Sequence, residues 1–189
     1  MWFDMSPNLS SPWREFLNEL DGVLTEPVEL HCIGGFAIVA AYGLARSTND
    51  LDYFSLVPCN RVHDLQGIAG EGSALARKHK VQVHHASVAT VPESYEERLT
   101  EPFPGRFENL RLFVLDPYDI VLSKLSRNEE RDRQDVEYLA KTQHLDHQVL
   151  RERYENELRP LLIGPVSRHD KTLEFWVEAY FGESPRSRL

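Results

Sequence analysis

The chain has 189 residues, a net charge of −9, 41% hydrophobic residues and 27% charged residues. That length suits one domain with a real core, or a small domain followed by a helical extension. The acidic balance argues against a protein that binds duplex nucleic acid non-specifically, because such proteins gain affinity by releasing counterions from phosphates. It leaves room for a local basic patch and for a small substrate such as a metal-bound nucleotide.

The sequence carries no sign of membrane insertion or export. No apolar stretch approaches the roughly 20 residues of a membrane-spanning helix, so no membrane partner is expected. The first residues, 1–4, lack the basic segment and long apolar run of a secretory signal. The two cysteines, Cys32 and Cys59, have no zinc-type spacing around them. These features favour a cytoplasmic protein with reduced thiols.

The first part of the chain alternates between strand-like and helical segments. Ser11 and Pro12 mark a helix start, with Ser11 as the capping residue, and Gly43 stands where a C-cap glycine is common. The predicted helices cover residues 13–24, 36–44, 61–80 with a break near 70–72, and 92–99. The predicted strands cover residues 28–33, 50–57, 81–85 and 110–115.

From Asp116 onward the chain is predicted to be helical. Asp116 can cap a helix that starts at Pro117, and Pro160 is expected to close a helix over 146–158. The last helix carries an apolar stripe that favours core packing or a dimer face over base stacking: Leu173, Trp176, Val177, Tyr180 and Phe181. The tail, 184–189, is expected to fray. Residues 1–115 are therefore predicted to form one domain, and 116–189 a helical region packed on it.

Gly34 and Gly35 stand between a predicted strand and a predicted buried helix. Glycine has no Cβ, so the backbone can turn sharply and come close to a phosphate. The helix that follows presents free N–H groups and the positive end of its dipole to an anion. A plain strand-to-helix turn is the commoner meaning of a Gly-Gly pair by itself.

Asp50 and Asp52 are two residues apart on a predicted strand, so their side chains share one face. Magnesium prefers oxygen ligands and commonly takes one or two carboxylates together with substrate phosphates. Two such ions stabilise the attacking and leaving oxygens in nucleotidyl transfer. The pattern predicts a Mg²⁺ or Mn²⁺ site at these residues. A solvated loop after Asn49 is the alternative, although Leu51 and Phe54 favour a strand.

Together, Gly34-Gly35 and the segment 46–52 resemble the signature of the DNA-polymerase-β-like nucleotidyltransferase superfamily. The motifs at 124–127 and 131–136 resemble those of nucleotidyltransferase-like toxins of the AbiEii and MenT type. They are more similar still to the DUF6036 nucleotidyltransferases, as are 92–99 and 115–119. The resemblance covers roughly residues 30–140.

The resemblance implies an α/β (α+β) fold: a small mixed-sheet nucleotidyltransferase core flanked by helices, followed by a C-terminal helical bundle. It implies that Gly34 and Gly35 contact the triphosphate of an NTP and that Asp50 and Asp52 hold the metals. Arg46 and Thr48 would position the phosphates or the backbone. The acceptor would be a tRNA end or a protein hydroxyl in a toxin–antitoxin setting, with an antitoxin as a further partner and a homodimer as one assembly.

Lys124 and two later aspartates form a second candidate group. The stem of Lys124 is predicted to point inward, where its ammonium could neutralise triphosphate charge. Asp132 and Asp135 lie one turn apart on a helix, and an aspartate on an apolar helix face needs a partner. They are predicted to orient Lys124 or to act as a base. The alternative is a structural salt bridge of these aspartates with Lys124 or Arg131.

The sequence departs from the superfamily at the third carboxylate, which most active members carry on a later strand. The candidate strand, 81–85, offers Gln82 and His84 instead, and His84 could serve as a neutral ligand or a base. Glu93 or Glu96 could substitute from the next helix. A site with one metal, or a degenerate site, therefore stays open.

One basic cluster has two interpretations. The cluster comprises Arg61, Arg77, Lys78 and Lys80. A solvated basic face is the favoured interpretation, and contact with an RNA acceptor is the other.

The sequence as a whole predicts a metal-dependent nucleotidyltransferase that moves a nucleotide monophosphate from an NTP to a macromolecular acceptor. The alternative is a catalytically degenerate nucleotide- or partner-binding module of the same fold.

Overall fold

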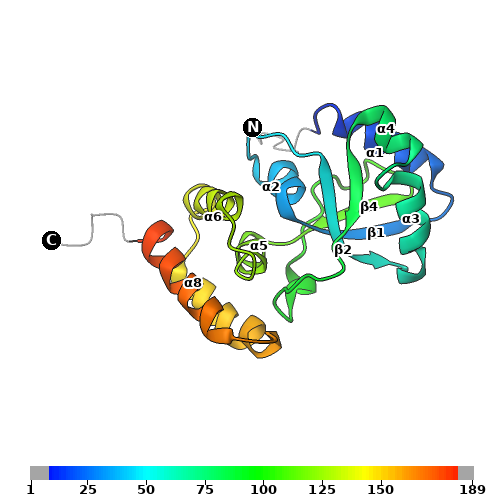
Figure 1. Cartoon of the computed structure of the whole chain (residues 1–189). Coiled ribbons are helices and arrows are strands. Elements are labelled where there is room, and N and C mark those ends of the chain that lie inside the picture. The colour runs from blue at the N-terminus through cyan, green and yellow to red at the C-terminus, as the bar shows by residue number, and fades with distance from the viewer. Residues whose placement is uncertain (1–8, 183–189) are drawn as a thin grey trace. The chain divides into compact units, whose positions relative to one another are not determined.

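The computed structural model describes residues 9–182, and the chain divides into two compact units (Figure 1). One unit comprises Met1–Ala89 and Leu99–Leu115, and the other Thr90–Arg98 and Asp116–Leu189. Within the described residues, the fold is mixed α/β, with one four-stranded sheet and eight α-helices. The predicted fold class is therefore confirmed. The tail 184–189 lies outside the described residues.

The sheet belongs to the first unit and has the order β3-β2-β1-β4. Its strands are β1 (Val28–Ile33), β2 (Asp50–Val57), β3 (Gln82–His85) and β4 (Leu110–Val114). Strand β1 runs antiparallel to β2 and parallel to β4, and β2 runs parallel to β3. The four strands lie where the alternation of apolar residues predicted them, and β2 begins at Asp50, so this aspartate is not in a solvated loop.

One face of the sheet is the core of the first unit. Leu30, Leu51 and Tyr53 are fully buried there. Helices α3 (Val62–Ala69) and α4 (Ala74–His79) contact β3, and Gln66 of α3 donates a hydrogen bond to the Tyr53 hydroxyl at 2.9 Å. Helix α1 (Trp13–Val23) packs beside α4 (Figure 1). Because alternate residues of a strand face opposite sides, burial of Leu51 and Tyr53 turns Asp50 and Asp52 to the other face.

The start of α1 differs from the prediction. The N-cap position is Pro12, and no side-chain hydrogen bond caps the helix. Ser11 lies one residue too early, so the prediction that it caps the helix is wrong.

Helix α2 (Gly34–Tyr42) includes both glycines in its first turn, so it begins two residues before the predicted start at Phe36. It contacts both β1 and β2. Gly43 has a left-handed backbone with φ of 74° at the C-cap, which confirms the predicted role of that glycine.

The second unit is helical. It contains α5 (Pro117–Ser123), α6 (Glu130–Thr142), α7 (His147–Arg153) and α8 (Val166–Tyr180), with η2 (Tyr95–Arg98) as a short turn. After α7 the chain continues through a π-helical segment, η3 (Tyr154–Leu158), and a 3₁₀ turn, η4 (Arg159–Leu161). Pro160 therefore lies inside a helical turn instead of closing a helix at 158.

Two sequence signals of this unit are borne out. The Asp116 side chain accepts a hydrogen bond from the Asp119 backbone N–H at 2.9 Å, and Pro117 occupies the first turn of α5. Trp176 is fully buried and donates from Nε1 to Asn128 Oδ1 at 3.3 Å, so this part of the α8 stripe is core. No described helix is long and apolar enough to cross a membrane.

A buried ion-pair network ties the segment 90–98 to the helices of the second unit. The carboxylate of Asp119 is inaccessible to solvent and accepts from Arg98 at 3.0 and 3.2 Å. Arg153 donates to the same carboxylate at 3.0 Å, and Arg98 also donates to Glu157 at 2.7 Å. Burial raises the pKa of Asp119, and the hydrogen bonds from Arg98 oppose that rise.

Candidate functional site

The turn from β1 into α2 depends on Gly34. Ile33 is still extended, and Gly34 then takes a positive φ of 72°, which L side chains rarely adopt. A Cβ on Gly34 would lie 2.7 Å from Oδ2 of Asp52. The glycine therefore allows a backbone conformation and also the close approach of the Asp52 carboxylate to the first turn of α2.

Gly35 makes room for two other side chains. A Cβ there would lie 2.9 Å from a terminal nitrogen of Arg46 and 3.4 Å from Oγ1 of Thr48. The Thr48 hydroxyl donates to the carbonyl of Asp50 at 3.2 Å, and Trp13 donates from Nε1 to the Thr48 carbonyl at 3.2 Å. The segment before β2 is therefore held between α1 and the start of α2.

The acid pair faces two polar residues of the neighbouring strand. In the parallel β2–β3 register, Asp50 is opposite Gln82 and Asp52 is opposite His84. Gln82 donates from Nε2 to Asp50 Oδ1 at 2.9 Å, and His84 Nδ1 lies 2.9 Å from Asp52 Oδ1. Gln82 and His84 thus contact the acid pair directly.

The carboxylates of Asp50 and Asp52 each have one oxygen that could bind a ligand. Within residues 9–182, no hydrogen bond or ion pair engages Oδ2 of Asp50 or of Asp52. Behind them, burial raises the pKa of the Cys32 thiol, and the charge of Asp52 raises it further. The thiol therefore stays neutral on the core side of the sheet.

The donor set suits a hard cation only in part. Two carboxylates with available oxygens fit magnesium, which completes its shell with substrate phosphates and water. In the described part of the chain, no group of three or more His, Cys, Asp or Glu residues is arranged to hold a metal ion. A metal at this position would therefore depend on oxygens of the substrate.

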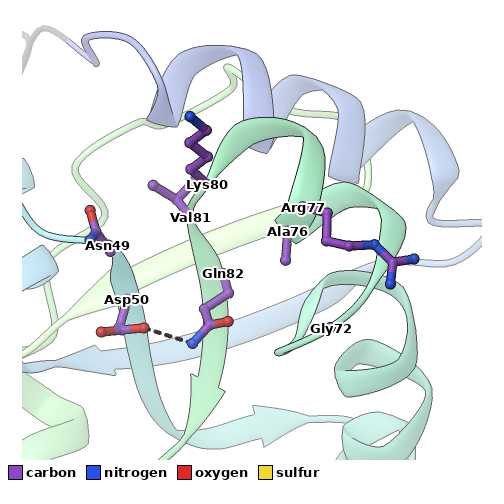
Figure 2. A pocket seen from close by; sticks show the side chains of 8 residues that line it. All are labelled: Asn49, Asp50, Gly72, Ala76, Arg77, Lys80, Val81 and Gln82. Atoms are coloured by element: carbon purple, nitrogen blue, oxygen red, sulfur yellow. Dashed lines mark hydrogen bonds between the residues drawn. The ribbon is translucent and has the colours of Figure 1, made fainter.

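A hollow of about 370 Å³ borders the acid pair on the side of Asp50 (Figure 2). Asn49 and Gln82 line it beside Asp50, while Arg77 and Lys80 line it from the end of α4. Figure 2 shows the hydrogen bond that joins Asp50 and Gln82 at one side of this hollow. No sequence pattern joined Asp50 and Gln82 with Arg77 and Lys80 in one site, because only the β2–β3 pairing and the turn after α4 bring them together.

The four residues of the predicted basic cluster differ in whether they form ion pairs. Arg61 pairs with Glu26 at 2.6 Å and with Asp64 at 3.3 Å. Lys78 pairs with Glu19 at 2.6 Å. Arg77 and Lys80 form no ion pair with any described residue. Two of the four cations are therefore paired with carboxylates, and the other two, Arg77 and Lys80, line the hollow.

The second candidate group lies in the other unit. The side chain of Lys124 is 5% exposed, and its Nζ donates to Asp132 Oδ1 at 3.0 Å and to Asp135 Oδ2 at 2.9 Å. Arg127 donates to both oxygens of Asp132, at 2.8 and 2.6 Å. Asp132 Oδ2 also accepts from the backbone of Glu129 at 3.1 Å, which completes a capping box for α6.

These contacts control the charge of Asp132. Burial alone would raise its pKa, but the hydrogen bonds from Arg127 and the charge of Lys124 outweigh burial and lower the pKa to about 2. Asp132 is therefore ionised at neutral pH, which suits a residue that orients Lys124 more than one that accepts a proton. The contacts of Lys124 with Asp132 and Asp135 are also those expected of a purely structural salt bridge, the alternative given by the sequence.

The predicted site residues thus fall into two groups. The first unit brings Gly34 beside Asp52, and Gly35 beside Arg46 and Thr48. The second unit contains the other group, Lys124 with Asp132 and Asp135. Glu93 and Glu96, the other candidates for a third carboxylate, also belong to the second unit.

The comparisons with known proteins give one match. A family described as "Nucleotidyltransferase of unknown function (DUF6036)" matches residues 14–176. No curated protein matches the chain, and neither does any solved structure.

Proposed function

The chain belongs to the DUF6036 family of nucleotidyltransferases of unknown function, and from this premise we propose that it transfers a nucleotide monophosphate from an NTP to a macromolecular acceptor. The observation that carries the proposal is the contact between Gly34 and Asp52, where a Cβ would come within 2.7 Å of Oδ2. A phosphate binder and a metal ligand are thereby neighbours, as the reaction requires.

The proposed roles follow from the chemistry of each group. The first turn of α2 offers backbone N–H groups to the triphosphate at Gly34 and Gly35, and the guanidinium of Arg46 adds positive charge beside Gly35. Oδ2 of Asp50 and Oδ2 of Asp52 would hold Mg²⁺ or Mn²⁺, which would neutralise the phosphate charge.

The test is transfer of label from α-labelled NTPs, with Mg²⁺ and either total tRNA or a cell lysate as the acceptor. The proposal expects label on an acceptor with the wild-type protein and at least a hundredfold less with Asp52→Asn. Lack of transfer from each of the four NTPs would contradict the enzymatic function. Thermal melting of both proteins shows whether the variant is folded.

A binding module without catalysis is the second candidate. The observation that favours it is the replacement of the third carboxylate by Gln82 and His84, which contact Asp50 and Asp52 at 2.9 Å. Such a module would melt at a higher temperature with an NTP and Mg²⁺, yet would label no acceptor. The same two measurements therefore separate the two functions.

A toxin–antitoxin role is the finer proposal. Induced expression of the wild-type chain is expected to arrest growth, and Asp52→Asn is expected to relieve the arrest, because the arrest would come from transfer. Growth arrest by both proteins would contradict this role while leaving the transfer reaction open to the labelling test.

A further inference from the structure

The acid pair has two chemically different flanks. On the flank of Asp52 lies Gly34, whose missing Cβ lets the Asp52 carboxylate approach the first turn of α2, where backbone N–H groups can bind a phosphate. On the flank of Asp50 lies the hollow bordered by Asn49 and Gln82 (Figure 2). In the transfer an acceptor hydroxyl attacks the α-phosphorus of the NTP opposite the bond to the leaving pyrophosphate. The new P–O bond forms as that bond breaks, pyrophosphate leaves, and the proton of the hydroxyl passes to water. With the triphosphate beside Asp52, the acceptor approaches from the flank of Asp50.

The charge of the hollow selects a kind of acceptor. Arg77 and Lys80 are exposed and form no ion pair with any described residue, although the chain as a whole has a net charge of −9. Figure 2 shows that both side chains extend from the α4 end of the hollow, at a distance from Asp50. Cations placed there would contact phosphates next to the reacting end of a polymer, rather than the reacting group itself.

The polar groups near Asp50 suit a nucleotide. Gln82 donates one N–H to Asp50 and keeps its carbonyl oxygen and a second N–H. Asn49 is exposed and adds a second amide at the same edge. Amide side chains can donate to and accept from a base edge at once, and a single-stranded end leaves its base edges accessible.

We propose that this hollow binds the acceptor, and that the acceptor is the end of a single-stranded nucleic acid whose backbone phosphates contact Arg77 and Lys80. The inference rests on the proposed function for the direction of approach. It goes beyond that function because it favours a polynucleotide over a protein hydroxyl and assigns the acceptor to residues of α4 and β3.

The test measures binding of a short fluorescein-labelled single-stranded RNA by fluorescence anisotropy across a salt series. The variant is Arg77→Gln combined with Lys80→Asn, since Lys80 has a left-handed backbone with φ of 59° that asparagine tolerates. We expect the double variant to bind about tenfold more weakly, and the salt dependence to fall by about 0.7 for each lost phosphate contact.

Lys78→Gln is the matched control. It removes one positive charge from the same helix, but Lys78 is paired with Glu19 and does not line the hollow. It should leave the salt dependence unchanged. Equal weakening by this control and by either single variant, Arg77→Gln or Lys80→Asn, would overturn the inference, because the effect would then come from net charge.

Measurements of NTP binding and of acceptor labelling separate this inference from the proposed function. Melting with an NTP and Mg²⁺ should respond equally in the wild type and in the double variant, because neither changed residue belongs to the triphosphate flank. If the wild type binds NTP but not RNA, or labels a protein in RNase-treated lysate, the nucleic-acid acceptor is wrong and the transferase remains. If RNA binding depends on Arg77 and Lys80 but no NTP binds, the nucleic-acid site stands and the transferase is wrong.

Discussion

The two pairs of aspartates in this protein have the same chemistry in sequence and different surroundings in the fold. Asp132 and Asp135 are buried, and Lys124 donates to both of them. Asp50 and Asp52 are partly accessible, and their neighbours on β3 are an amide and an imidazole. The first pair has its charge compensated inside the protein. The second pair has available oxygens and no cationic lysine or arginine partner among the described residues.

The difference shows how to separate a structural carboxylate from one available to a ligand. A buried ion needs compensation to exist at all, because desolvation costs several kcal/mol per ion. An ion at the surface is stable without compensation and can exchange its water for a metal.

Removing the cation of the buried pair should have the largest effect. Lys124→Met leaves the buried carboxylates of Asp132 and Asp135 without their shared ammonium and should destabilise the protein by about 3–5 kcal/mol. Urea denaturation measures the loss. A second variant, Lys124→Met with Asp135→Leu, should recover part of it, because it removes a charge together with its partner. No recovery would show that packing of the lysine stem, and not its charge, was lost.

Removing a charge of the accessible pair should affect activity without unfolding the protein. Asp52→Asn should lower NTP transfer at least a hundredfold, which corresponds to about 2.7 kcal/mol of transition-state stabilisation. Its stability should stay within about 0.5 kcal/mol of the wild type, as for other surface positions. A loss of stability comparable to that of Lys124→Met would make Asp52 a structural residue. The two pairs of aspartates would then no longer differ in role.

Acid should act on the buried pair through Asp132. Its folded-state pKa of about 2 lies below the ordinary value of 3.8, so its contribution is present above pH 4 and is lost as the pH falls toward 2. The contribution amounts to about 2 kcal/mol, from 1.36 kcal/mol per pKa unit. Denaturation of the wild type and of Asp132→Asn across this window measures the difference, which should shrink as the pH falls. A difference independent of pH would refute the low pKa.

The smallest effect should come from the glycine that contacts the accessible pair. Gly34→Ala places a Cβ 2.7 Å from Asp52 Oδ2 on a backbone with φ of 72°. Gly105→Ala has the same kind of backbone, with φ of 68°, and no atom within 4 Å. Both variants should lose about 1–2 kcal/mol to backbone strain. Only Gly34→Ala should also weaken NTP binding, as measured by melting with NTP and Mg²⁺.

The sequence by itself determined the elements and the first half of the site. Strands β1 and β2 could be predicted because their apolar residues alternate and Pro58 stops β2, and a C-cap glycine marks the end of α2. The pairing of Gly34 with Asp52 could be predicted from a strand, a helix and a second strand in close succession. Local periodicity is sufficient where the residues that determine a structure are neighbours in the chain.

Only the tertiary structure decided which charges are compensated. The hydrogen bonds of Gln82 with Asp50 and of His84 with Asp52 depend on the parallel register of β2 and β3, which no local pattern specifies. The same is true of Arg98 and Asp119, which are 21 residues apart. The charge of an aspartate is visible in sequence, but its burial and its partners depend on which distant segments pack around it. Those partners make Asp132 a structural ion and leave Asp52 available for a ligand.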